Sequence, residues 1–237
     1  MIEVPLSAFT FVPNAEKTKQ RTHFSLLSVV KDAEGRVAER FSQDYPLEIP
    51  QEKIEAAKKR NVTFTPTFHL TPGRYTVETA AMDQATGKVG VLRSVLIVPP
   101  PAVGVGLSSV SVVGRVDSGA PGFTGSEDPL QFQNAKIIPN LGDPISKASS
   151  TGLPIYLIVY PSSEISEKPR MELEFLRGGQ VVAVSNPQLP APDVEGRIAY
   201  LATVPMDKLE PGRYVIRALV RQGSAAAEEY AFFSVNP

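Results

Sequence analysis

Few side chains in this sequence could perform acid–base or nucleophilic chemistry. Its 237 residues include two histidines, His23 and His69, and no cysteine, which excludes thiol catalysis, disulfide bonds and cysteine-based metal sites. Both histidines lie in segments that alternate like strands, and we interpret both as surface residues. No nucleophile elbow or phosphate-binding loop occurs, and Gly104-Val105-Gly106 lacks the third glycine of a dinucleotide-binding motif. The sequence therefore predicts no catalytic residue, no cofactor and no enzyme.

Carboxylates are the second group that could carry chemistry, because paired acids bind calcium or hydrolyse glycosides. They cluster at Glu127-Asp128, Asp143, Glu164 with Glu167, Asp193 with Glu195, and Glu228-Glu229. These positions read as turns or solvent-facing strand residues, without the Asp-x-Asp-x-Asp density of a calcium loop. We interpret them as solvated surface, with a loop calcium or a catalytic pair as the alternatives, and we predict no metal site.

The overall charge excludes several kinds of partner. Lys and Arg number 24 against 25 Asp and Glu, for a formal net charge of -1, so there is no basic field for nucleic acid. No run of 18 apolar residues occurs, so no membrane span is predicted. The N-terminus lacks the pattern of a signal peptide and reads as a strand, which suggests a piece of a longer protein. The hydrophobic fraction of 42% is enough to build a core.

The elements that must position these side chains are strands. Two hairpins are expected before residue 99, at 24–31 with 36–41 and at 75–83 with 88–98, each turning through a segment that ends in glycine. Residues 2–9 and 62–70 predict further strands, the latter with Val62, Phe64 and Phe68 on one face. Residues 50–60 predict the one short helix. After residue 106, strands are expected at 107–116, 153–160, 171–176, 181–184, 197–204, 214–220 and 230–235.

A proline-rich segment divides the chain. Pro99, Pro100 and Pro101 cannot donate to a sheet ladder, so residues 99–106 read as a linker. The prediction is an all-β protein of two tandem immunoglobulin-like β-sandwich domains, residues 1–98 and 107–237, with one short helix in the first. The two halves should then have separate hydrophobic cores.

One motif occurs in both halves. Leu70-Thr71-Pro72-Gly73-Arg74-Tyr75 matches Leu209-Glu210-Pro211-Gly212-Arg213-Tyr214 at identical spacing. We interpret each copy as a corner in which Pro-Gly turns the chain and the tyrosine packs inward. Its hydroxyl should then bond to the backbone, as in a tyrosine corner.

These segments resemble a known family. The order LTPGRYTVETAAMDQATGKVG, a proline-rich linker, IIPNLGDPISKASSTGLPIYLIVYP and EGRIAYLATVPMDKLEPGRYVIRALV is similar to the C-terminal region of the VWFA-related proteins of Acidobacteria. In that family a von Willebrand factor A domain precedes this region behind an export signal. The resemblance therefore implies an extracytoplasmic location, periplasmic or secreted. The metal-binding Asp-x-Ser-x-Ser motif of the A domain is missing, so no metal site carries over.

Recognition in sandwich domains is usually placed in loops, and the longest irregular segment is expected at 117–152. It contains an apolar stretch at 132–138 that should fold onto the second sandwich, and it has room for one short edge strand. We select four residues of this loop as the candidate binding residues: Phe123, Glu127, Asp128 and Phe132. The expected ligand is polypeptide rather than sugar or ion.

The leading hypothesis is a non-enzymatic extracytoplasmic structural or protein-interaction module, whose partner is another protein or a neighbouring domain of the same polypeptide. The alternative is a carbohydrate-binding module, for which Tyr45, Tyr156, Tyr160 and Phe123 are the aromatic candidates. Aromatics aligned on an exposed sheet face would favour that alternative. A hydrolase is a third and weaker hypothesis, which a cleft with two carboxylates would support.

Overall fold

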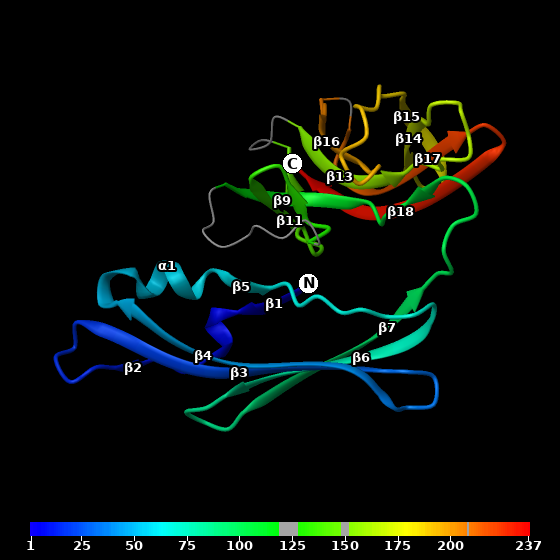
Figure 1. Cartoon of the computed structure of the whole chain (residues 1–237). Coiled ribbons are helices and arrows are strands. Elements are labelled where there is room, and N and C mark those ends of the chain that lie inside the picture. Colours follow the sequence, from blue (N-terminus) through cyan, green and yellow to red (C-terminus); the bar gives the residue numbers. More distant parts are fainter. Residues whose placement is uncertain (119–127, 148–151, 208) are drawn as a thin grey trace. The chain divides into compact units, whose positions relative to one another are not determined.

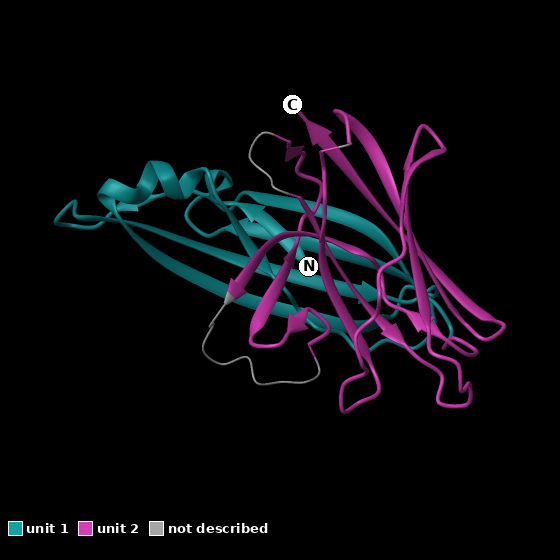
Figure 2. Ribbon diagram, turned by 90° about the horizontal axis from the view of Figure 1, so that it is seen from above, with its two compact units in different colours: residues 1–100 teal, residues 101–237 magenta. Residues whose placement is uncertain are grey.

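The computed structural model describes residues 1–118, 128–147, 152–207 and 209–237, and its described part is all-β apart from short helical turns. The chain separates into two compact units, Met1–Pro100 and Pro101–Pro237 (Figure 2). The division falls within the run of three prolines, where the backbone cannot continue a sheet ladder.

The first unit is built on one antiparallel sheet of five strands. These are β2 (Val12–Pro13), β3 (Lys19–Lys31), β4 (Val37–Pro50), β6 (Gly73–Asp83) and β7 (Val89–Val98). β3 pairs with β4 on one side and with β2 and β6 on the other, and β7 pairs with β6. Both expected hairpins are confirmed, and Gly35 and Gly87 turn them with φ of 80° and 68°.

A smaller layer covers one face of this sheet (Figure 1). It consists of β1 (Ile2–Pro5) paired with β5 (Asn61–Phe64), the 3₁₀ turns η1 (Leu6–Ala8) and η2 (Gln51–Lys53), and the helix α1 (Ile54–Lys58). Phe9 and Phe24 stack between the layers with ring centroids 4.1 Å apart. The core of this unit contains Val4, Leu6, Phe9, Phe24, Leu26 and Phe64.

Two expected strands of the first unit are shorter than the sequence pattern suggested. The strand expected at 62–70 ends at Phe64, and the strand expected at 2–9 gives way to η1 after Pro5. Proline explains both ends, because Pro5 and Pro66 have no N–H to donate to a ladder.

The second unit is a sandwich of two sheets. One sheet has the order β10-β11-β9-β13-β16, with β8 also paired to β13, and the other has the order β12-β18-β17-β14-β15. The first sheet contains β8 (Gly106–Leu107), β9 (Ser111–Ser118), β10 (Gln131–Phe132), β11 (Ala135–Pro139), β13 (Leu153–Tyr160) and β16 (Ile198–Val204). The second contains β12 (Ile145–Ser146), β14 (Arg170–Arg177), β15 (Gln180–Ser185), β17 (Gly212–Gln222) and β18 (Ala225–Asn236).

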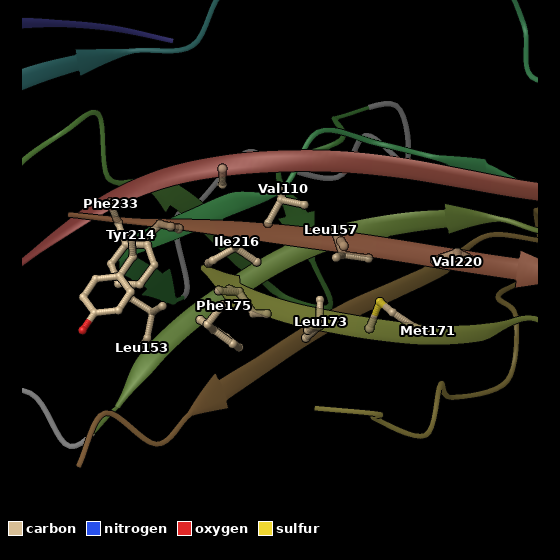
Figure 3. Packing of buried hydrophobic residues seen from close by; sticks show 14 of the residues in the cluster. Val110, Leu153, Leu157, Met171, Leu173, Phe175, Tyr214, Ile216, Val220 and Phe233 are labelled. Carbon is tan, nitrogen blue, oxygen red and sulfur yellow. The ribbon is translucent and has the colours of Figure 1, made fainter. Parts of the chain in front are cut away.

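The inward residues of both sheets form one core in this unit (Figure 3). Leu153, Ile155 and Leu157 of β13 are fully buried there against Leu173 and Ile216 of the facing sheet. Burying branched apolar side chains of this size supplies the main favourable free energy of a sandwich.

Two boundaries of the second unit differ from the expected ones. The loop expected at 117–152 contains β10, β11 and β12, and Ile137 of β11 is fully buried. The linker expected at 99–106 ends early, because Val105 lies in the core and Gly106 pairs with Tyr160. In both places strand pairing with residues distant in sequence decides the structure, and local composition does not reveal such partners.

The sequence repeat extends to a whole sheet. β15-β14-β17-β18 has the same order and connections as β4-β3-β6-β7, and Gly212 pairs with Val235 as Gly73 pairs with Val98. The Tyr75 hydroxyl donates to the Thr71 carbonyl and the Tyr214 hydroxyl to the Glu210 carbonyl, both at 2.8 Å. Both tyrosines are buried, so the prediction of two tyrosine corners is confirmed.

Candidate functional site

Two of the four expected binding residues lie where the 128–133 segment covers the outer face of the β11-β9-β13-β16 sheet. Asp128 and Phe132 are described there, whereas Phe123 and Glu127 fall outside the described residues. Phe132 packs edge-on against Tyr156 of β13, with ring centroids 6.1 Å apart. Beneath them Ile137 and Ile158 form a second, smaller apolar cluster. Phe132 therefore packs over this apolar cluster.

Asp128 stabilises the segment that carries Phe132. Its carboxylate pairs with the Lys136 ammonium, whose side chain is only 8% exposed, and it also accepts the Leu130 N–H at 2.9 Å. The Tyr156 hydroxyl donates to the Gln131 carbonyl at 3.3 Å, and burial raises the pKa of Tyr156 to about 12. A buried cation is stable only when it is paired, so Asp128 stabilises the buried Lys136 whether or not a ligand binds.

A cavity of about 350 Å³ lies against this segment and brings together Asp128, Phe132, Tyr156, Asp193 and Arg197. It contains two carboxylates, the feature that would support hydrolysis. Each carboxylate, however, already pairs with a cation: Asp128 with Lys136, and Asp193 with Arg197 at 3.1 Å. Burial alone would raise the pKa of Asp193, but hydrogen bonds from Arg197 and Glu195 outweigh it and hold that pKa below its usual value. A general acid needs the opposite shift.

Asp193 and Glu195 belong to a turn motif that the sequence reading did not identify. In Asp32–Arg36 and again in Asp193–Arg197, the Asp carboxylate accepts the backbone N–H of the residues two and four positions later. The closing arginine pairs with both acids, and the glycine before it has φ of 80° in each copy. The shared pattern Asp-x-Glu-Gly-Arg in the sequence was the available signal. These acids stabilise turns.

Other chemistry finds no support in the described part of the chain. His23 and His69 are both exposed. No group of three or more His, Asp or Glu side chains that could hold a metal ion occurs among the described residues. The helices within the same residues include none long and apolar enough to cross a membrane.

A larger cavity, of about 700 Å³, lies between the loops 161–170 and 186–192 of the second unit. Gln222, itself buried, shapes one wall of it. Its amide oxygen accepts the Ser162 N–H at 2.8 Å, and its amide nitrogen donates to the carbonyls of Ser162, Ile165 and Glu167 at 3.0–3.1 Å. Gln222 thus holds the 161–170 loop in place through these hydrogen bonds.

The aromatic candidates for sugar binding are scattered. Tyr45 stacks on Phe24 at 5.3 Å, Tyr156 is buried, and Tyr160 is 41% exposed. The structure instead exposes two aromatics that the sequence reading missed, Tyr230 at 46% and Phe232 at 77%. They lie two residues apart on β18 and therefore share the outer face of its sheet, where they alternate with inward residues.

β7 exposes more large apolar side chains than any other strand of the first unit. Its exposed large apolar side chains are Val89, Val91, Leu92, Val95, Leu96 and Ile97, of which Val91 is 71% exposed. β7 pairs with β6 on one side, and no strand of the described residues pairs with its other side. Arg93, held 3.5 Å from Glu78, is the one charged residue of the strand. Edge strands usually carry more charge or a proline, so this edge is unprotected.

A hollow follows the inner side of this edge. A cavity of about 380 Å³ is lined by Ile2, Val4 and Phe9 on one side and by Leu92 and its neighbours in β7 on the other. The five-stranded sheet thus ends in a free edge with unfilled apolar space beside it. An added strand with apolar side chains would hydrogen-bond to the free backbone groups of the edge and would fill the hollow.

No protein-family model matches the sequence, and no curated protein is detectably similar to it. Solved structures similar to this chain include one described as BspA_C_WT, with 11% identity and a TM-score of 0.23 over 99% of this chain and 91% of that one. Another is the wild-type C-terminal domain of the AgI/II polypeptide BspA of Streptococcus agalactiae, with 10% identity and a TM-score of 0.22 over 98% and 91%. TM-scores this low do not establish a shared fold.

Proposed function

We propose that this chain is a non-enzymatic protein-interaction module that binds an extended polypeptide strand along the free edge of β7. The observation that carries the proposal is the edge itself: a ten-residue strand, Val89–Val98, that exposes six large apolar side chains and has no described strand on one side. Strand addition to such an edge gives affinity through the backbone and specificity through alternate side chains.

The backbone groups available on this edge follow from the hairpin register. The Asp83 N–H donates to the Lys88 carbonyl at 2.9 Å, so this pair is hydrogen-bonded. Hydrogen-bonded pairs recur at every second residue of an antiparallel ladder. The N–H and C=O groups of Val91, Arg93, Val95 and Ile97 therefore point to the free edge, away from β6.

The resemblance noted from the sequence supports the setting of this function. We propose that the chain is the C-terminal part of an exported VWFA-related protein, in which it acts outside the cytoplasm. A binding edge for extended polypeptide suits a module that links its own protein to another one or to a neighbouring domain.

The test is a selection of ten-residue peptides from a random display library against the full chain at low micromolar concentration. The wild-type protein should enrich proline-poor peptides with alternating apolar residues. The variant Val91→Lys/Val95→Lys should lose this enrichment, because an edge lysine blocks the approach of a second strand. The matched control is Val182→Lys, since Val182 is also exposed, on the edge strand β15 of the second unit.

Nuclear magnetic resonance then locates the binding site. A selected peptide should slow amide exchange at Val91, Arg93, Val95 and Ile97, and leave the already bonded Leu92 and Ser94 unchanged. Enrichment of the same peptides by the β7 variant, or protection elsewhere in the chain, would remove β7 as the binding site.

One observation favours carbohydrate binding as a second candidate function. Tyr230 and Phe232 lie two residues apart on one exposed sheet face, beside Arg217, which pairs with Glu228 at 2.7 Å and Glu174 at 3.1 Å. Aromatic faces with hydrogen-bonding groups beside them can bind sugars. Affinity electrophoresis in gels with soluble polysaccharides tests this candidate. Retardation that is lost in Phe232→Ala supports it, and equal mobility in all gels rejects it.

A further inference from the structure

We propose that the strand added to β7 is β7 of a second copy of this chain, so that the module forms a two-fold symmetric dimer with one sheet running through both copies. This inference rests on the proposed function, because it names the partner for the same edge. It follows from the side-chain pattern of β7, which is complementary to itself in one register.

The complementary register places Ser94 opposite Ser94 of the second copy. Val91 then faces Ile97 on the outer side of the sheet, and Leu92 faces Leu96 on the inner side. Arg93 faces Val95, so no like charges oppose each other. Directly opposed apolar side chains stabilise an antiparallel pair, and opposed like charges destabilise it.

The other symmetric registers are poorer. An axis at Arg93 places two guanidinium groups opposite each other. An axis at Leu92 or at Val95 leaves one end of each strand without a partner. The axis at Ser94 overlaps the strands from Gly90 to Val98, nearly the whole of β7. Like the other registers, it places the residues whose N–H groups point outward opposite one another, so overlap and side-chain pairing decide among them.

The hollow beside β7 is a second, independent observation that favours this occupant. Leu92 borders that cavity of about 380 Å³ together with Ile2, Val4 and Phe9. In the Ser94 register, Leu96 of the second copy lies opposite Leu92 on the same side of the sheet. Its side chain would enter this apolar space, which would remove exposed surface from both copies at once.

The expected dimer is weak. A single strand pair buries a small interface, at the low end of the range below about 1,200 Å² that is typical of transient complexes. The association should therefore depend on protein concentration, and it should be driven by apolar burial rather than by ion pairs.

Sedimentation of the full chain from micromolar to millimolar concentration tests the dimer. The mass of the wild-type protein and of the control Val182→Lys should double as concentration rises. Val91→Lys/Val95→Lys should stay monomeric, with a circular dichroism spectrum that shows the fold intact. A wild-type protein that is monomeric throughout, or a dimer that survives the β7 substitutions, would overturn the inference. The proposed function would survive a monomeric result if the peptide selection still depends on β7.

Disulfide cross-linking tests the register. The chain has no cysteine of its own, so only the introduced thiol can react. In this register Ser94 forms a non-hydrogen-bonded pair, whose Cα atoms lie about 4.5 Å apart and within reach of a disulfide. Ser94→Cys should therefore oxidise to a covalent dimer at least about tenfold faster than Val95→Cys, whose two copies are offset by two residues. Equal rates, or a faster reaction of Val95→Cys, would reject the Ser94 register.

Discussion

Tyr75 and Tyr214 perform the same task in the two units. Each hydroxyl reaches back four residues to a backbone carbonyl while the ring packs inward, and Tyr214 also stacks on Phe233 at 5.2 Å. The carbonyl would otherwise lose its partner at a turn that contains a proline. The repeated motif is thus explained by a shared structural demand.

Substitutions at the two corners should have a graded effect. Tyr214→Phe removes one hydrogen bond and should lower the free energy of unfolding by about 1 kcal/mol, whereas Tyr214→Ala should lower it by about 3–5 kcal/mol. Tyr75 should behave likewise in its own unit. Urea titration measures both, with the exposed Tyr230→Ala as a control that should change stability by less than about 0.5 kcal/mol. Losses below about 1 kcal/mol in both corner alanine variants would contradict this role.

Asp83 is the buried acid of the first unit. Its carboxylate accepts the N–H of Thr10 and of Ala85, each at 2.9 Å. Burial alone would raise the pKa of Asp83, but these hydrogen bonds outweigh burial and hold it below the usual value of 3.8. Asp83 therefore joins the β6–β7 hairpin loop to the segment before β2.

This carboxylate should make the first unit sensitive to acid. A lowered folded-state pKa means that Asp83 stabilises the fold above about pH 4 and that the contribution is lost as pH falls through the folded pKa. Asp83→Asn should lower stability at pH 7 and flatten the fall of stability between pH 4 and pH 2. Urea titrations over this range measure it, with the exposed Glu16→Gln of the same unit as the control. An unchanged slope in Asp83→Asn would refute the assignment.

At the scale of elements, the segment that leads into β8 depends on close packing. Gly104 has φ of 90°, and a Cβ at this position would lie 2.5 Å from the Cβ of Ala225. Because Gly104 has no side chain, the backbone can pass this close to Ala225, and Val105 then lies in the core of the second unit. The chain thus leaves the proline run and becomes part of the sandwich within a few residues.

Gly104→Ala should therefore destabilise the second unit by about 1–3 kcal/mol through strain and overpacking. Gly35→Ala is the matched control, since its φ is 80° but no atom lies within 4 Å of the added Cβ. The difference between the two variants isolates the packing contribution. Thermal unfolding measures both, and equal losses would show that only the backbone conformation matters at Gly104.

For the whole molecule, the two units should unfold separately. Among the described residues the buried cluster of the first unit is much smaller than that of the second, so the first should unfold at lower denaturant concentration. Methionine methyl resonances report each unit: Met82 lies in the first, and Met171 and Met206 lie in the second. A single transition shared by all three methyl groups would contradict this expectation.

Local chemistry made much of this fold predictable from the sequence alone. Alternating residues with glycine at positive φ indicated both hairpins of the first unit, and the Pro-Gly-Arg-Tyr repeat indicated the two buried tyrosines. The proline run indicated where the compact units divide. Each of these features depends on residues within a few positions of one another, so composition and spacing reveal it.

Only the tertiary structure decided which segments pair and which edges stay free. Residues 131–139 read as part of a long loop with room for one short edge strand, yet β11 lies between β10 and β9. Asp128 and Phe132 read as contact residues, and only the folded chain shows that Asp128 pairs with Lys136 and that Phe132 packs against Tyr156. β7 read as an ordinary hairpin strand, yet its outer edge has no partner among the described strands. Strand neighbours are chosen by packing between residues far apart in sequence, which is why the candidate binding edge became visible only in the folded chain.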